Sequence, residues 1–244
     1  MSAAPYQQKV SLSPDSKWLP HQGDAGHKAD MKQASDFPSL KVITHPLVQH
    51  KLTLMRDKTT QPILFRQLLK EIAMLIGYEV TRDLPLASQP IETPLAPMNA
   101  PVLAQPVTIV SILRAGLGMA DGLRELIPSA REGHIGLYRN PETKQPHDYF
   151  LKLPADMGCA ILVDPMLATG GSAARAAQIL LDHGLTPASI RLVTLVSAPE
   201  GMQVFAQAHP DIPVYTASLD ERLDERAYIV PGLGDAGDRI FGTL

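Results

Sequence analysis

One cysteine, Cys159, is all that the 244 residues contain, so no disulfide can form within the chain. Chains without disulfides suit a reducing compartment, and we expect a cytoplasmic protein. Apolar runs long enough to cross a bilayer are missing, as is the apolar core of an N-terminal signal peptide, so we expect no membrane partner. The net charge of -3 lacks the basic bias of nucleic-acid-binding proteins, and we expect no nucleic-acid partner.

The first 40 residues are poor in hydrophobic side chains and show no periodic pattern. Such a segment buries too little apolar surface to fold alone, so we predict a flexible N-terminal extension over residues 1–40. The whole chain is 45% apolar and 19% charged, which is ordinary for a globular protein. We therefore predict one domain over residues 41–244.

Apolar runs alternate with helical patterns through most of that domain. The spacing predicts early helices over 47–55 and 62–77, and later helices over 117–126, 173–183 and 200–208. Near-continuous apolar runs predict strands over 107–113, 135–138, 160–163, 191–196 and 214–217. Repeated prolines between 79 and 106 exclude a long helix and predict an irregular β arm, with an extended piece at 78–81. The alternation indicates an open parallel sheet that helices cover on both faces.

The stretch 160–172 is the strongest candidate for a functional site. Four apolar residues lead to Asp164 at the predicted tip of a strand, and the turn 169–172 leads into a helix. Ligands of open parallel sheets sit at the carboxyl ends of the strands, and a helix N-terminus offers backbone N–H groups to a phosphate. The carboxylate suits sugar hydroxyls or a metal. Together the two features predict a site for a phosphorylated sugar.

Three other phosphate-binding patterns fit less well. The sequence 232–237 matches G-x-G-x-x-G, but too few residues follow it for the helix and the acidic residue of a dinucleotide fingerprint. The sequence 116–122 follows a predicted strand, but Asp121 stands where the third glycine belongs, which leaves a weak dinucleotide-binding alternative. No lysine precedes Ser172, so the turn 169–172 is not a P-loop.

The stretch 161–172 resembles the PRPP-binding motif of type I phosphoribosyltransferases, where PRPP is 5-phosphoribosyl 1-diphosphate. Its form, together with 111–116, 138–140 and 228–238, resembles the uracil phosphoribosyltransferases among them. The resemblance runs from about residue 42 onward and implies the type I fold. That fold is an open parallel sheet flanked by helices, with a β arm and a C-terminal hood from about residue 210 to 244 completed by the N-terminal helices. The implied reaction converts uracil and PRPP to UMP and diphosphate.

The resemblance also implies which residues carry this reaction. Asp164, Arg114 and Asp235 are the implied catalytic residues. The implied PRPP-binding residues are Arg114, Arg139, Asp164, Pro165, Met166, Leu167, Ala168, Thr169, Gly170, Gly171, Ser172 and Asp235. The implied uracil-binding residues, in a pocket read largely by backbone groups, are Ile229, Gly234, Asp235 and Ala236. The polar segment 140–149 after Arg139 is expected to be a mobile loop that closes over PRPP.

Cofactor and partner expectations follow from the same resemblance. Most type I relatives carry two adjacent acids where this chain has Asp164-Pro165, so no direct protein ligand for Mg²⁺ is expected and Mg²⁺ arrives on the diphosphate. At least a dimer is implied, and GTP is a candidate effector for which the sequence shows no site. Two alternatives remain: a PRPP-binding regulatory relative that binds RNA, and a dinucleotide-dependent oxidoreductase that uses 116–122.

Overall fold

A mostly parallel sheet forms the centre of the protein. We analysed a computed structural model, which describes residues 36–139 and 146–243. The strand order is β1-β10-β9-β7-β4-β5-β6, and the short strand β8 pairs with β9 beside this path. The strands are β1 (Leu40–Val42), β4 (Val107–Leu113), β5 (Arg131–Arg139), β6 (Pro146–Lys152), β7 (Cys159–Val163), β8 (Met166–Leu167), β9 (Ile190–Ser197) and β10 (Val214–Leu219). The predicted open parallel sheet is confirmed, except that the edge strand β6 runs antiparallel to its neighbour.

The central strands are apolar because neighbours cover them on every side. Every residue of β7 and of β9 is buried, and each of these strands has a parallel partner on both edges. The edge strand β6 differs, because it pairs antiparallel to β5. The predicted loop 140–149 is therefore wrong from Pro146 onward, where the chain is a strand; residues 140–145 lie outside the described part.

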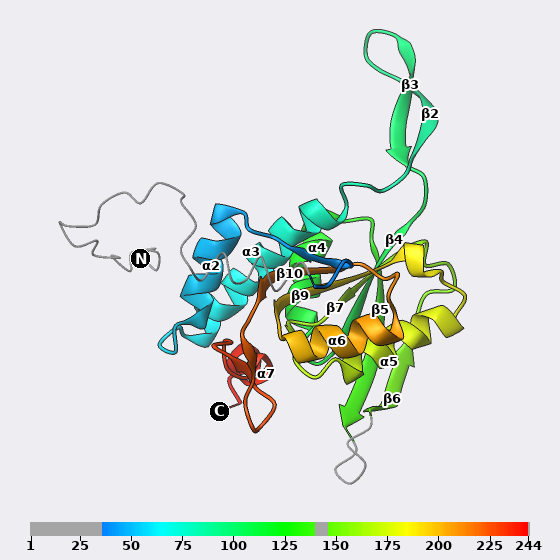
Figure 1. Cartoon of the computed structure of the whole chain (residues 1–244). Coiled ribbons are helices and arrows are strands. Elements are labelled where there is room, and N and C mark those ends of the chain that lie inside the picture. The colour runs from blue at the N-terminus through cyan, green and yellow to red at the C-terminus, as the bar shows by residue number, and fades with distance from the viewer. Residues whose placement is uncertain (1–35, 140–145, 244) are drawn as a thin grey trace, which may run out of the picture.

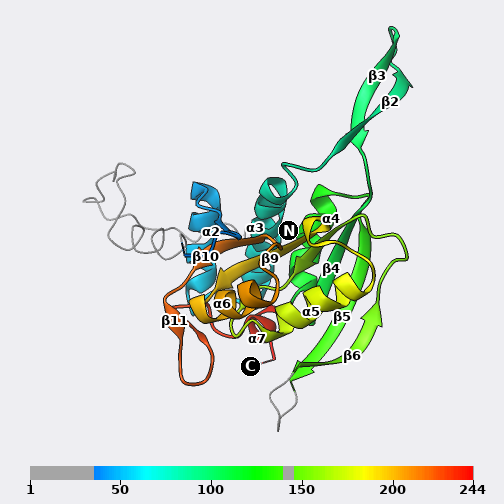
Figure 2. The same cartoon turned by 45° about the vertical axis from the view of Figure 1, so that its right-hand side comes forward.

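Helices cover both faces of the sheet, as predicted (Figures 1 and 2). Two hydrophobic clusters, one on each face, hold these two layers to the sheet. The helices of one face are α2 (Pro46–Arg56), α3 (Pro62–Val80), α4 (Leu117–Leu126) and α7 (Ala236–Phe241), and those of the other face are α5 (Gly171–Asp182) and α6 (Pro199–Ala208). No helix in the described part of the chain is both long and apolar enough to span a membrane.

Helix α3 continues past Gly77, where the sequence predicted its end and an extended piece. A side chain at Gly77 would come within 2.4 Å of Leu123 Cδ2 on α4, and one at Gly122 within 2.2 Å of the Lys70 carbonyl oxygen on α3. Both glycines lie where α3 and α4 pack too closely for a larger residue. Gly77 is therefore a packing residue inside α3 and not its C-terminal cap. The same contact gives Gly122 a packing role in place of a dinucleotide-binding one.

The predicted β arm is present and is more regular than expected. Strands β2 (Leu86–Glu92) and β3 (Pro97–Leu103) form an antiparallel hairpin that projects away from the sheet and helices (Figures 1 and 2). Every residue of β2 is exposed, and large hydrophobic side chains such as Leu95 and Met98 lie open to solvent. The hairpin leads into the start of β4, so it leaves the sheet at the edge where the parallel strands begin.

Both ends of the predicted domain differ in detail from expectation. Leu40, assigned to the extension, already begins β1, which pairs with β10 in the sheet; residues 1–35 lie outside the described part. Strand β10 belongs to the sheet, so the segment that leaves it starts only after Leu219. That segment contains the antiparallel pair β11 (Arg222–Leu223) and β12 (Ile229–Val230), followed by α7.

Candidate functional site

The centre of the candidate site is the edge at which β4 and β7 end. These two strands are parallel neighbours, and the chain proceeds from β4 to β5 on one side and from β7 to β9 on the other. Such a switch in direction opens a crevice at the carboxyl ends of the two strands, where open sheets bind ligands. Arg114 follows β4 and Asp164 follows β7, so the sequence prediction that both lie at this edge is confirmed.

Asp164 is the acidic group of this edge. Its backbone N–H donates to the Val193 carbonyl oxygen at 3.2 Å, which fixes the residue beside β9. Burial raises the pKa of the Asp164 carboxyl to about 7, and a hydrogen bond from the Met166 backbone N–H opposes that rise. The carboxyl therefore changes its charge near neutral pH. It can accept hydrogen bonds from hydroxyls and, once ionised, stabilise positive charge nearby.

The loop after Asp164 is built against β9. The Pro165 carbonyl oxygen accepts from the Leu195 N–H at 3.0 Å, and Met166 and Leu167 form the short strand β8 alongside β9. The sequence did not predict this strand. Helix α5 begins at Gly171 and not at Ala173 as predicted, because Gly170 caps it in a left-handed conformation with φ of 79°.

The loop before α5 is held in place by close backbone contact with α6. A Cβ atom at Gly201 would lie 2.4 Å from the Ala168 carbonyl oxygen, and one at Gly170 would lie 2.5 Å from the Gly201 carbonyl oxygen. A Cβ at Gly171 would meet no protein atom within 4 Å. The first turn of α5 therefore has open space beside it, and its free N–H groups and dipole suit an anion.

Arg114 connects the sheet edge to the far end of the chain. A Cβ at Gly116 would lie 2.5 Å from the Val163 carbonyl oxygen, so the turn after β4 touches the tip of β7. The Arg114 side chain is exposed, and its guanidinium lies over the Phe241 ring of α7 at 5.3 Å from the centroid. This contact places a cation between the strand tips and α7.

The segment 229–236 supplies the remaining wall. Ile229 and Ala236 are buried and anchor this segment in the core. Asp235 Oδ1 accepts from the Asp238 N–H at 3.0 Å and so caps α7. The sequence excluded a helix after 232–237, and that prediction was wrong because six residues suffice for the short helix α7. Gly234 has φ of 77° and is exposed at the turn into this helix.

One predicted residue is described only in part. The Arg139 backbone ends β5, the other neighbour of β4, and its residue partner on β6 is Pro146. The Arg139 side chain and the following residues 140–145 lie outside the described part of the structure. The structure therefore brings the motifs at 111–116, 161–172 and 228–238 together at one edge of the sheet. Of the motif at 138–140, it places the backbone of residues 138 and 139.

Residues that the sequence analysis missed hold the segment 229–236 in place. Asp220 follows β10 and pairs with Arg56 of α2 through both of its carboxylate oxygens, at 2.6 and 2.8 Å. Arg239 of α7 donates to the Met55 and Leu233 carbonyl oxygens at 2.6 and 2.8 Å. Asp220 had a signal in the sequence, because an acid after an apolar strand is the same pattern that singled out Asp164.

Comparison with known proteins gives a consistent result. The sequence model of the family described as uracil phosphoribosyltransferase matches residues 42–243. The chain is 59% identical to the uracil phosphoribosyltransferase of Rhodospirillum centenum over 215 residues, which is 87% of this chain and 100% of the relative. It is 56% identical to the enzyme of the same name from Burkholderia thailandensis, over 87% of this chain and 99% of the relative.

A solved structure also resembles the chain. A protein from Aquifex aeolicus superposes with a TM-score of 0.77 at 34% identity, over 83% of this chain and 97% of that one. None of these comparisons supports the RNA-binding alternative or the oxidoreductase alternative. The match to the family model begins at Val42, the last residue of β1, so the whole predicted extension over residues 1–40 lies outside it.

Proposed function

The chain belongs to the uracil phosphoribosyltransferase family, and from this premise we propose how its residues share the work of the reaction. It transfers the 5-phosphoribosyl group from PRPP to uracil, giving UMP and diphosphate, in pyrimidine salvage. The observation that carries the assignment of residues is the meeting of Asp164, the start of α5, Arg114 and α7 at one edge of the sheet.

The 5′-phosphate of PRPP lies on the first turn of α5. There is open space beside Gly171, and in this proposal the backbone N–H groups of 168–172 and the Thr169 and Ser172 hydroxyls donate to the phosphate. Pro165, Met166 and Leu167 hold this loop against β9 and form its floor. Asp164 receives the ribose hydroxyls and stabilises positive charge as the bond from C1′ to the diphosphate breaks and the ribose becomes oxocarbenium-like.

Cationic side chains receive the leaving diphosphate. Arg114 is exposed between the strand tips and α7, where its guanidinium can form paired hydrogen bonds with phosphate oxygens. Arg139 ends the neighbouring strand β5 and serves the same group. Asp235 touches both substrates from the start of α7. Positioning and charge stabilisation, with no strong base, account for the chemistry.

Uracil lies against the backbone of Ile229 and of 234–236. The base is small, planar and neutral, and it presents adjacent donors and acceptors that peptide groups can match. The exposed turn at Gly234 lets the base approach the backbone closely. The buried side chains of Ile229 and Ala236 anchor this backbone in the core.

Mg²⁺ enters the site on the substrate. Asp164 is followed by Pro165, so this strand tip offers one carboxylate, and the described residues contain no group of three or more His, Cys, Asp or Glu side chains that could hold a metal ion. This donor set fits a cation that takes most of its ligands from diphosphate and water. The ion's chemistry is to neutralise charge on the leaving group.

The assembly and its regulation extend the proposal. The protein is a homodimer at least, and the β2–β3 hairpin packs on a second copy, which would cover the exposed Leu95 and Met98. Light scattering with Leu95→Ser and Met98→Ser tests this, because a molecular mass unchanged from that of the wild type would contradict it.

GTP is an effector and the enzyme is cytoplasmic; a GTP titration of activity and cell fractionation test these two statements. The buried lone Cys159 suits that compartment.

One assay tests the function directly. Purified protein is mixed with PRPP, Mg²⁺ and a panel of purine and pyrimidine bases, and the nucleotides formed are separated and identified. We expect UMP from uracil, with diphosphate in equal amount. No UMP from uracil, or a nucleotide from another base at a higher rate, would overturn the proposed function.

A further inference from the structure

Asp220 is a buried carboxylate with an unusual number of donors. It is 4% exposed at the end of β10, and four groups donate to its two oxygens. Oδ1 accepts from Arg56 Nη2 at 2.6 Å and from the Ser218 hydroxyl at 2.6 Å. Oδ2 accepts from Arg56 Nη1 at 2.8 Å and from the Gly232 N–H at 2.9 Å. This carboxylate is fully committed to protein partners, so it is not available to a substrate.

The same pair of side chains holds the Gly232 residue on both sides. Arg56 Nη1 donates to the Gly232 carbonyl oxygen at 2.6 Å, while Asp220 accepts from its N–H. Gly232 has φ of 60°, and a Cβ there would lie 2.0 Å from the Ile229 carbonyl oxygen. The next carbonyl, that of Leu233, accepts from Arg239 Nη1 at 2.8 Å. Two consecutive residues are therefore fixed immediately before Gly234.

A glycine-rich turn needs hydrogen bonds from other elements if its backbone is to recognise a ligand. Glycine samples more backbone conformations than any other residue, so the turn 232–234 has little rigidity of its own. Recognition by backbone groups requires their positions to be held within about 0.5 Å. The pair of Arg56 and Asp220 supplies that hold from α2, which is 176 positions from Gly232 in sequence, and from the end of β10, which is 12 positions away.

We propose that Asp220 and Arg56 are positioning residues for the base pocket, which set the affinity for uracil through Gly232 and leave the affinity for PRPP unchanged. This inference rests on the proposed function. The PRPP loop at 165–172 is held by β9 and α6, through contacts that involve neither side chain. Asp235, the proposed PRPP-binding residue nearest the turn, caps α7, which Arg66 and Arg239 hold through the Ile240 and Met55 carbonyl oxygens. The turn at Gly232 can therefore be loosened while both parts of the PRPP site keep their own contacts.

Asp220→Asn is the direct test. The amide keeps the size of the carboxylate but has one acceptor oxygen, so its NH₂ group faces a donor of Arg56 or of Gly232 in either orientation. We expect the KM for uracil to rise roughly tenfold to a hundredfold as the turn relaxes, with the KM for PRPP within about twofold of the wild type. Loss of folded protein would lower the apparent kcat and would leave both KM values in place.

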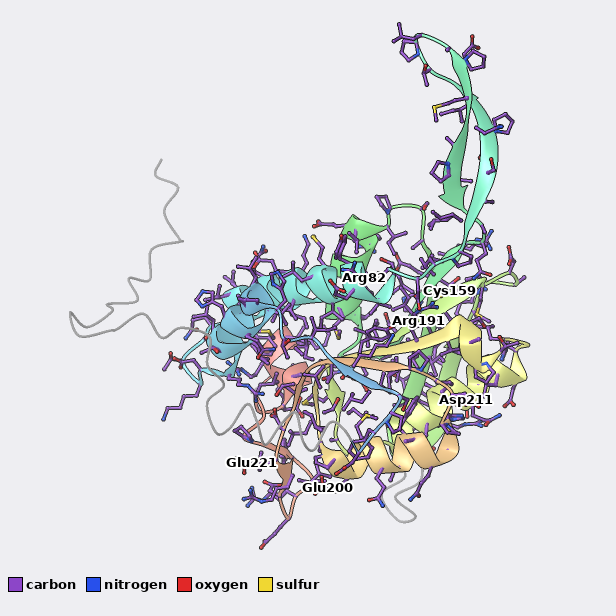
Figure 3. All side chains as sticks on the ribbon, turned by 45° about the horizontal axis from the view of Figure 1, so that its top comes forward. Arg82, Cys159, Arg191, Glu200, Asp211 and Glu221 are labelled. Atoms are coloured by element: carbon purple, nitrogen blue, oxygen red, sulfur yellow. The ribbon has the colours of Figure 1, made fainter. Side chains whose placement is uncertain are left out.

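The pair of Asp83 and Arg191 provides the matched control. Asp83 Oδ1 accepts from Arg191 Nη2 at 2.8 Å, and Arg191 Nη1 donates to Cys159 Sγ at 2.8 Å. Figure 3 shows Arg191 and Cys159 close together and well apart from Glu200 and Glu221. Asp83→Asn makes the same substitution in another arginine–aspartate pair, one in which the acid is exposed and accepts from arginine through one oxygen, and we expect both KM values to stay at wild-type levels.

Arg56→Lys keeps the proposal testable if Asp220→Asn does not fold. Lysine retains the charge but lacks the fork that reaches both Asp220 oxygens and the Gly232 carbonyl, so the same selective rise in the KM for uracil is expected. A KM for uracil within twofold of the wild type in a folded variant would overturn the inference, as would equal rises for both substrates. A wild-type protein that forms no UMP would instead overturn the proposed function.

Discussion

Replacing Gly201 of α6 by alanine should displace the PRPP loop at 165–172, which packs directly against this glycine. The new Cβ would lie 2.4 Å from the Ala168 carbonyl oxygen and 2.6 Å from that of Leu167, and both are backbone atoms. Ordinary contact between these atoms needs about 1 Å more, so α6 and the loop must move apart by about that distance. Overpacking of this kind costs about 1–3 kcal/mol of stability. A 1 Å misplacement in an active site can cost about a hundredfold in rate, which is the loss we expect in kcat/KM for PRPP.

Gly171→Ala makes the comparison informative, because it should do the reverse. A Cβ at this first residue of α5 meets no protein atom within 4 Å, and alanine favours helix by up to about 1 kcal/mol over glycine. We expect the thermal midpoint to stay or rise, while kcat/KM for PRPP falls at least about tenfold because the methyl group occupies the proposed phosphate position.

Thermal melts and steady-state kinetics at saturating uracil measure both quantities. Two results would refute the reasoning. Wild-type kinetics for Gly171→Ala would mean that the phosphate does not lie at the start of α5. Wild-type stability and kinetics for Gly201→Ala would mean that the loop and α6 do not depend on backbone contact. The KM for uracil serves as the internal control, because Gly232 and its partners touch neither glycine.

Three further predictions use single side chains. Because burial raises the pKa of Asp164 to about 7, its ionised fraction grows from about one tenth at pH 6 to about nine tenths at pH 8. The ratio of kcat/KM for PRPP in the wild type to that in Asp164→Asn should therefore rise about tenfold between these pH values. A ratio that does not change with pH would contradict the role given to the carboxylate. Asp235→Ala should abolish uracil turnover and cost about 1 kcal/mol by removing the α7 cap, whereas Asp235→Asn keeps the cap and separates the two effects by melting temperature. Cys159 is fully buried, and burial raises the pKa of its thiol, so a thiol reagent should label it only after unfolding, and rapid labelling of the folded protein would show that the strand is accessible.

The sequence predicted best where one physical cause dominates. The strands β7 and β9 are buried on both faces, so their continuous apolar runs are unambiguous. The glycine turn before α5 follows such a strand, and Asp164 stands between them. Position along one parallel strand was enough to predict the edge at which this residue lies.

Prediction failed where the cause lies elsewhere in the chain. Gly77 resembles a helix end, but it is a contact point for α4, which no local pattern reveals. Residues 148–152 of strand β6 are all exposed, so no alternation of buried and exposed residues marks its pairing with β5. The Arg56 and Asp220 pair joins residues 164 positions apart, so although Asp220 follows an apolar strand, no local pattern shows that Arg56 is its partner.

The long sequence separation of these contacts has a consequence during synthesis. Arg56 and Arg239 join positions 164 to 184 residues apart, between the first helices and the last one. A ribosome delivers the loop at 165–172 before the segment 229–241, so a nascent chain has the loop of the proposed phosphate site before it has the proposed base pocket. Contacts of such span slow folding, because each closes a long loop. A product truncated before α7 is then expected to keep the loop at 165–172 but to lack both the base pocket and Asp235, so it should form no UMP.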